Sequence, residues 1–144
     1  MCAAICKEAA LRRDYTNELI ETIYFGGGTP SLLSTEQLTA IVEQLYQSFT
    51  IKADAEITLE ANPDDINTAK LKEWKKTGIN RLSIGVQSFF EEDLKWMNRA
   101  HNAEQAERCI KAAQDEGFDN LTIDLIYGTP VSYTHLTLPT NREV

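Results

Sequence analysis

Long apolar runs, a signal peptide and a surplus of basic charge are all absent from this 144-residue sequence. No apolar run approaches the roughly 18 to 20 residues that cross a bilayer. The first residues also lack the basic-then-apolar order of a secretory signal. We therefore expect a chain without a transmembrane segment that works in the cytoplasm.

Basic residues are outnumbered by acidic ones. The 14 lysines and arginines stand against 22 aspartates and glutamates, which leaves a net charge of −8. Proteins that hold nucleic acid through a broad basic face show the opposite balance, so we expect no nucleic-acid partner. Cysteine occurs only at Cys2, Cys6 and Cys109, an odd number without the spacing of a disulfide scaffold. Reduced thiols are the expected state.

The composition is that of an ordinary globular protein, with 42% hydrophobic and 25% charged residues. Short apolar segments alternate with amphipathic ones, which predicts strands at 22–25, 56–60, 81–86 and 121–125. The amphipathic segments predict helices at 2–15, 34–49, 68–77, 91–97 and 102–117. Ser34 and Gln37 show the capping-box spacing that starts the second of these helices.

Alternating strands and helices predict βαβ units and a parallel sheet. The apolar run around Asp124 is typical of a strand buried on both faces. Four strands are too few for an eight-stranded barrel of about 250 residues. The predicted fold class is therefore α/β, a parallel-stranded partial (β/α) barrel that is incomplete at both ends.

The alternation stops near residue 131. A helix is due after this point, but residues 132–144 have no helical period and carry a proline in their middle. We expect residues 1–131 to form the partial core domain and residues 132–144 to be an unrelated tail.

Glycine and polar residues gather where the predicted strands end. The segment from Gly26 to Thr29, and then Glu60, Gln87 and Asp124, each stand at or just after the carboxyl end of a strand. These ends meet at one mouth in parallel α/β folds, so we expect one shared site. The glycines let backbone amides approach a ligand, and the alternative is an ordinary tight turn.

Each of the remaining site candidates also has a structural alternative. Glu60 is suited to accept bonds from hydroxyls or an amine, or is a solvated carboxylate. Gln87 suits a ribose or a carboxylate, or caps a loop. Asp124 is expected to be buried and therefore paired, with Arg99 as its partner or as a clamp for a carboxylate ligand. His101 is equally a cap or a ligand.

The aromatic and sulfur side chains favour structural roles. Trp74 and Trp96 fall in helical stretches and are expected to serve in packing and not as stacking platforms for a ligand. Cys2 and Cys6 have the first gap of a Cys-x3-Cys-x2-Cys iron–sulfur motif, but the third thiolate would be needed where Ala9 stands. We expect both cysteines on the buried stripe of the first helix, and we predict neither metal ligands nor catalytic residues in this chain.

Five strings, taken together, resemble the radical S-adenosylmethionine (SAM) proteins of the oxygen-independent coproporphyrinogen III oxidase group. They occur in the family's order over roughly residues 3–130: Tyr-Phe-Gly-Gly-Gly-Thr-Pro-Ser (24–31), Glu-Ala-Asn-Pro (60–63), Ser-Ile-Gly-Val-Gln-Ser-Phe (83–89), Asn-Arg-Ala-His (98–101) and Ile-Asp-Leu-Ile-Tyr-Gly (123–128). The resemblance implies a partial barrel of the radical SAM type. Its mouth would hold a [4Fe-4S] cluster on three cysteines, with S-adenosylmethionine on the fourth iron.

The resemblance also implies the residues that bind the cofactor. The methionyl end of S-adenosylmethionine would be held by Gly27, Gly28 and Thr29. Further contacts to its methionyl and ribose groups would come from Glu60, Gln87, Arg99 and Asp124. The family's cysteine loop lies upstream of the helix that opens this chain, so we expect an internal fragment that lacks the cluster ligands and is inactive as given.

Two strings distinguish branches of the group. The oxidase branch has Glu-x-Asp-Pro and Arg-x-Gln where this chain has Glu-Ala-Asn-Pro and Arg-Ala-His. This difference favours the haem-chaperone branch, with haem or a porphyrin as partner of the parent protein, and leaves the oxidase as the alternative.

Two functions outside this enzyme class are also compatible with the sequence. One is a carrier that binds haem or a nucleotide without turnover, which the missing cluster cysteines favour. The second is a barrel enzyme that binds a phosphorylated substrate at the glycine loop. The phosphate-binding enzyme is disfavoured because Glu60 and Asp124 would repel an anion.

Overall fold

The computed structural model describes residues 1–131. Four strands form one parallel sheet in the order β1-β2-β3-β4. The strands are β1 (Ile20–Phe25), β2 (Ile51–Ala61), β3 (Arg81–Gln87) and β4 (Asn120–Leu125). The α-helices are α1 (Cys2–Leu11), α2 (Thr35–Ser48), α3 (Thr68–Lys76), α4 (Glu91–Trp96) and α5 (Ala103–Asp115), and the short 3-10 helices are η1 (Pro30–Leu32) and η2 (Pro63–Asp65).

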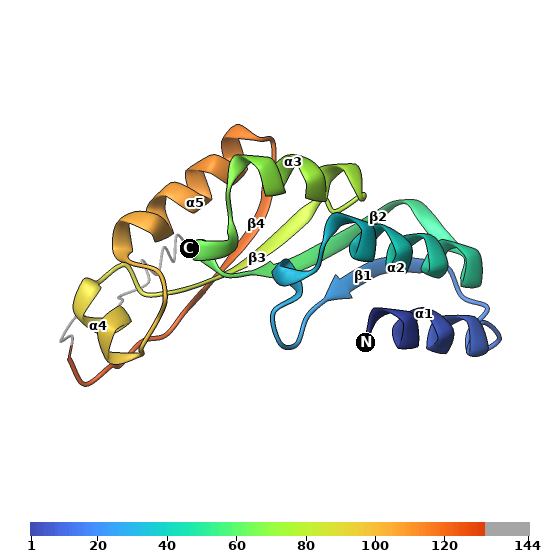
Figure 1. Ribbon diagram of the computed structural model, residues 1–144, viewed down its shortest axis with the longest axis horizontal. Coiled ribbons are helices and arrows are strands. Elements are labelled where there is room, and N and C mark those ends of the chain that lie inside the picture. Colours follow the sequence, from blue (N-terminus) through green and yellow to red (C-terminus); the bar gives the residue numbers. More distant parts are fainter. Residues whose placement is uncertain (132–144) are drawn as a thin grey trace, which may run out of the picture.

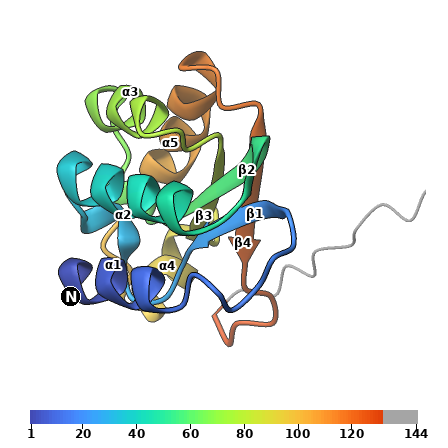
Figure 2. The same ribbon diagram turned by 90° about the vertical axis from the view of Figure 1, so that its right-hand side faces the viewer.

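Sequential parallel neighbours joined by helical crossovers make an arc of a (β/α) barrel, which confirms the predicted fold class. The helices gather on one face of the sheet in the described residues, and the opposite face is bare (Figures 1 and 2). The sheet therefore has an apolar side toward the helices and a second side that is free to carry polar groups.

The middle strands show how the sequence divides between these two sides. In β3, Leu82, Ile84 and Val86 are fully buried, while the alternate positions Ser83 and Gly85 line a cavity on the other side. From the helices, the largest buried side chains facing this core are Leu38, Leu71 and Trp74. Alternation along the strand thus turns one face toward the core and the other toward the site.

Local signals place the helix ends as predicted. The Ser34 hydroxyl accepts a hydrogen bond from the Gln37 amide at 3.3 Å, and the Gln37 side chain accepts one from the Ser34 amide at 3.0 Å. This reciprocal pair is the predicted capping box. Gly78 and Gly117 follow α3 and α5 with φ of 95° and 78°, a conformation that stops a helix and favours glycine.

The first helix differs from the prediction in length and burial. It ends at Leu11 instead of residue 15, and on its apolar stripe only Ala9 is buried. Cys2 and Cys6 are half-buried, so their predicted place on a buried stripe is wrong. The physical reason is that α1 lies at the end of the helical layer, where its packing partner is α2.

The last strand also differs from the prediction. β4 is not buried on both faces, because it is the outermost strand of the described sheet and no neighbour covers its outer edge. Asp124 is exposed because it lies on the same face as Ser83 and lines the cavity there, which corrects the expectation of a buried carboxylate. Strand β2 begins at Ile51, five residues earlier than predicted, and its pairing with β1 includes a register shift opposite Ile20 and Thr22.

The two tryptophans have different environments. Trp74 is 2% exposed and lies in the core as predicted, whereas Trp96 is 56% exposed, so its predicted packing role is wrong. α4 is a single short helix that turns Asp93 and Leu94 inward, which leaves Trp96 on its outer side. Residues 132–144, the predicted tail, lie outside the described residues. No helix among residues 1–131 is long and apolar enough to cross a membrane.

Candidate functional site

A cavity of about 150 Å³ opens where the carboxyl ends of the strands meet. Each strand of the sheet contributes to its wall, either directly or through the loop that follows. The lining residues are Gly28, Thr29, Pro30, Glu60, Ala61, Asn62, Ser83, Gly85, Gln87, Arg99 and Asp124. Six of the seven predicted site residues are among them, and the seventh, Gly27, contacts the cavity wall through Glu60.

The glycine loop after β1 is a tight turn that also exposes backbone. Gly27 and Gly28 adopt φ of 77° and 65°, and a Cβ at either position would meet nothing within 4 Å. Glycine is therefore required there for its backbone conformation, and open space remains beside it. The two interpretations of this loop, a turn and a ligand-facing backbone, are compatible.

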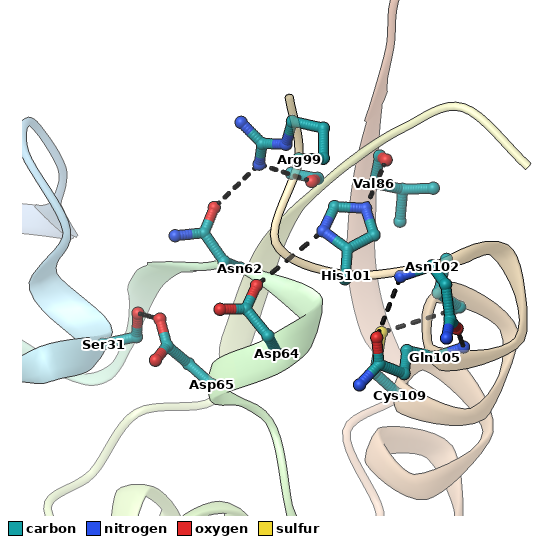
Figure 3. Close-up of polar contacts among 12 residues, drawn as sticks. Ser31, Asn62, Asp64, Asp65, Val86, Arg99, His101, Asn102, Gln105 and Cys109 are labelled. Atoms are coloured by element: carbon teal, nitrogen blue, oxygen red, sulfur yellow. Dashed lines mark hydrogen bonds and ion pairs between the residues drawn. The ribbon is translucent and has the colours of Figure 1, made fainter. Parts of the chain in front are cut away.

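The loop is fastened to the turn that follows β2. The Ser31 hydroxyl in η1 donates to the Asp65 carboxylate in η2 at 2.7 Å (Figure 3). Lys70 of α3 approaches the same carboxylate at 3.7 Å and the Ser31 carbonyl at 3.3 Å. This connection holds the glycine loop beside Glu60 and Asn62, the two polar residues at the end of β2.

Arg99 enters the cavity from the segment between α4 and α5. Its Nη2 donates to the Asn62 side-chain oxygen at 3.0 Å and to the Gly85 carbonyl at 3.2 Å (Figure 3). Its Nε is buried without a hydrogen-bond partner in the described residues. Of the two predicted roles of Arg99, the ion pair with Asp124 is not formed, and Asn62 and Gly85 hold its guanidinium instead.

Gln87 ends β3 in a left-handed conformation with φ of 67°. Its carbonyl accepts the Ile126 amide at 2.8 Å, so the backbone of Gln87 caps the loop after β4. Its side chain folds back over Gly85, because a Cβ added to Gly85 would stand 3.0 Å from the side-chain Nε2 of Gln87. The Gln87 side chain lines the cavity, where it could meet a ligand, and the Gln87 backbone caps the loop after β4.

His101 is buried and acts as a structural tie. Its Nε2 hydrogen-bonds with the Val86 carbonyl at 2.9 Å, and since a carbonyl only accepts, Nε2 carries the proton (Figure 3). Its Nδ1 lies 3.7 Å from an Asp64 carboxylate oxygen. The ring is thus fastened to the end of β3 through Nε2, which gives it a structural role, while its buried Nδ1 has no hydrogen-bond partner in the described residues.

Several residues of the site were not predicted. Asn62 falls within one of the five strings, but the sequence assigns it no role, although it fixes Arg99. The buried carboxylate of this region is Asp93, which accepts the Ser88 hydroxyl at 3.0 Å and the Thr129 hydroxyl at 2.6 Å. Ser88 is only five residues from Asp93, but Thr129 is 36 residues away, so the second of these bonds depends on the fold and leaves no local signal in the sequence.

The cysteines do not gather into a site in residues 1–131, where no group of three histidine, cysteine, aspartate or glutamate residues could hold a metal. Cys2 and Cys6 are half-buried on α1, and Cys109 is buried on α5. Burial raises the pKa of the Cys109 thiol to about 11.

The different burial of the three cysteines predicts how fast each is alkylated. Iodoacetamide at pH 8 should modify Cys2 and Cys6 readily and Cys109 slowly, because Cys109 is both covered and held as the thiol. Mass spectrometry of peptides at successive times measures the three rates, and alkylation in denaturant is the control. Equal rates for the three thiols in the folded chain would contradict the described burial.

Comparison with known proteins agrees with this arrangement. Residues 6–136 match the sequence model of the radical SAM superfamily. The chain belongs to the radical SAM superfamily. The predicted resemblance is thereby confirmed, and the open cavity lies at the strand ends of a radical SAM fold.

Two relatives show which members of the superfamily the chain is similar to. The heme chaperone HemW of Escherichia coli strain K12 is 41% identical over 111 residues, which are 77% of this chain and 29% of that protein. A mitochondrial radical S-adenosyl methionine domain-containing protein 1 of Dictyostelium discoideum is 46% identical over 120 residues, 80% of this chain and 27% of that protein. This radical SAM chain spans less than a third of either relative.

A solved structure supports the same placement. Coproporphyrinogen III oxidase (HemN) from Escherichia coli, a radical SAM enzyme, superimposes with a TM-score of 0.79 at 34% identity over 89% of this chain and 30% of that one. The archaeal Elp3 of Methanocaldococcus infernus superimposes with a TM-score of 0.65 at 20% identity, which shows the fold alone.

Proposed function

We propose that the cavity at the strand ends binds S-adenosylmethionine, and that residues 1–131 supply this site to a radical SAM protein of the haem-chaperone type. The observation that carries the proposal is the charge pattern of the wall. Glu60 and Asp124 both line the cavity, and Arg99 has a buried Nε with no partner in the described residues. An orphaned donor of this kind fits an acceptor on a ligand.

The charges of the ligand match those of the wall. S-adenosylmethionine carries a sulfonium and an ammonium, both positive, and one carboxylate. Two carboxylates and one guanidinium on the protein are the complementary set. Arg99 and the exposed amides of Gly28 and Thr29 suit the ligand's carboxylate, Glu60 suits its ammonium, and Gln87 and Asp124 suit the ribose hydroxyls.

The iron–sulfur cluster needs ligands of its own. In this family a [4Fe-4S] cluster supplies the electron that cleaves S-adenosylmethionine. The cysteines of the described residues do not fit it, since Cys109 is buried on α5 and Cys2 and Cys6 lie together on α1. We propose that the cluster ligands of the protein lie outside residues 1–131.

The haem-chaperone assignment rests on two strings and on the relatives. Glu-Ala-Asn-Pro and Arg-Ala-His depart from the oxidase pattern, and several of the matching proteins are named heme chaperones. Haem or a porphyrin is then the cargo of the whole protein, and we propose that this protein acts in the cytoplasm. We propose no haem ligand among residues 1–131, where the His101 side chain is 0% exposed and its Nε2 hydrogen-bonds with the Val86 carbonyl. The oxidase remains the second candidate, favoured by the likeness to HemN.

Isothermal titration calorimetry tests the proposed ligand. The 144-residue chain is titrated with S-adenosylmethionine up to millimolar concentration, and in parallel with inorganic phosphate. We expect saturable binding of one S-adenosylmethionine and no heat from phosphate, because Glu60 and Asp124 repel an anion. Phosphate binding without S-adenosylmethionine binding would favour the phosphate-binding enzyme and contradict the proposal.

A further inference from the structure

A tyrosine beside the cavity has a role that neither the sequence nor the comparisons assign. Tyr24 of β1 pairs with Thr58 of β2, so it lies on the same face of the sheet as Glu60, two residues further along. Its hydroxyl donates a hydrogen bond to Glu60 Oε1 at 2.8 Å. Tyr24 is not among the residues that line this cavity, and it lines an adjoining hollow that shares Gly28, Thr29 and Pro30 with it. Its contact with the wall of the cavity is the bond to Glu60.

The Glu60 carboxylate is held from two sides. Oε1 accepts the Tyr24 hydroxyl, and Oε2 accepts the Gly27 amide at 3.1 Å. Each carboxylate oxygen has two lone pairs, so each keeps one free acceptor position. The carboxylate is therefore fixed in orientation while half of its acceptor capacity stays available to the cavity that it lines.

The packing around this pair leaves it little freedom. A Cβ at Gly26 would stand 2.7 Å from Tyr24 Cε1 and 2.9 Å from Glu60 Oε1, so the phenol and the carboxylate rest directly on bare glycine backbone. The bond to Glu60, followed by partial burial, raises the pKa of the Tyr24 hydroxyl. The Tyr24 side chain is nevertheless 56% exposed, so the hydroxyl can be removed without opening the core.

We propose that Tyr24 is a positioning residue that aims the Glu60 carboxylate at a cationic group of the ligand. The inference rests on the proposed function and names the ligand group concerned, the ammonium of the methionyl end of S-adenosylmethionine. A carboxylate that is already held in place loses less conformational entropy when a ligand binds than one that the ligand must order. By holding Glu60, Tyr24 therefore strengthens binding in the cavity.

Tyr24→Phe tests the proposal, since it removes the hydroxyl and keeps the ring. We expect its affinity for S-adenosylmethionine to fall about fivefold, the usual effect of one hydrogen bond. The matched control is Tyr46→Phe, at a half-exposed tyrosine on α2 that is not part of the cavity, and it should bind as the unsubstituted chain does. Isothermal titration calorimetry measures the three affinities.

A second ligand separates positioning from a general structural effect. 5'-Methylthioadenosine has the adenosine and sulfur but no ammonium, so Tyr24→Phe should leave its affinity unchanged. Equal weakening for both ligands, or undiminished S-adenosylmethionine affinity in Tyr24→Phe, would overturn the positioning role alone. If the unsubstituted chain binds no S-adenosylmethionine, the proposed function is overturned, and this inference with it.

The hydrogen bond itself is measured without any ligand. Phenolate absorbance near 295 nm, followed as pH rises, should show one tyrosine that ionises later than free tyrosine. Glu60→Gln should bring the pKa of this tyrosine back toward its ordinary value, because the neutral amide accepts the phenolic proton more weakly and no longer repels the phenolate. An unchanged titration curve in Glu60→Gln would contradict the contact on which the inference depends.

Discussion

Replacing Arg99 by glutamine should weaken S-adenosylmethionine binding by about tenfold or more. The change removes the cation that faces the ligand's carboxylate and the buried Nε donor that has no partner among residues 1–131. Losing one partner of a desolvated charge pair costs about 2 to 5 kcal/mol, which is more than tenfold in affinity. Isothermal titration calorimetry on both proteins gives the ratio.

Two further variants show whether the effect belongs to the site. Arg99→Lys keeps the charge but loses the planar guanidinium that bonds Asn62 and Gly85. Its affinity for S-adenosylmethionine should therefore lie between those of the unsubstituted chain and Arg99→Gln. Arg108→Gln is the matched control, because Arg108 lies on the exposed side of α5 and pairs only with Glu104 among the described residues. Equal affinities for Arg99→Gln and Arg108→Gln would remove Arg99 from the binding site.

The largest effect on stability is expected at the centre of the sheet. Leu59 of β2 is fully buried between two strand neighbours, and Leu59→Ala should lower the free energy of unfolding by about 2 to 5 kcal/mol through lost burial and the cavity left behind. Urea denaturation followed by circular dichroism measures the change.

Leu11→Ala is the control for that experiment. Leu11 is exposed at the end of α1, and the same truncation there should change the free energy of unfolding by about 0.5 kcal/mol or less. If both substitutions had the same effect, the buried layer between the sheet and the helices would not be the core that stabilises the chain.

The order of elements was readable from the sequence because each signal is local. The Ser34 capping box, Gly78 and Gly117 act within a few residues, and each marks a helix end where the structure has one. The strand ends could also be placed, and since parallel strands share one carboxyl edge, the shared cavity followed from their order.

The environments of individual residues depended on contacts that the sequence does not encode locally. Asp124 has apolar neighbours on both sides and still is exposed, because the pairing of β4 with β3 turns it toward the face of the sheet that carries the cavity. The contact between Tyr24 and Glu60 spans 36 residues and requires the register of β1 against β2. The same holds for Arg99, whose partner Asn62 lies on another strand end.

Nuclear magnetic resonance of the ¹⁵N-labelled chain tests the proposed binding site most directly, because it shows where S-adenosylmethionine binds. We expect the ligand to shift the amide signals of Gly28, Thr29 and Gln87 around the cavity and to leave those of Ala9 and Phe49 unchanged. The last two line an apolar groove between α1 and α2, a separate hollow on the molecule. Shifts gathered at that groove, with Gly28 and Gln87 unaffected, would contradict the assignment of the strand-end cavity as the S-adenosylmethionine site.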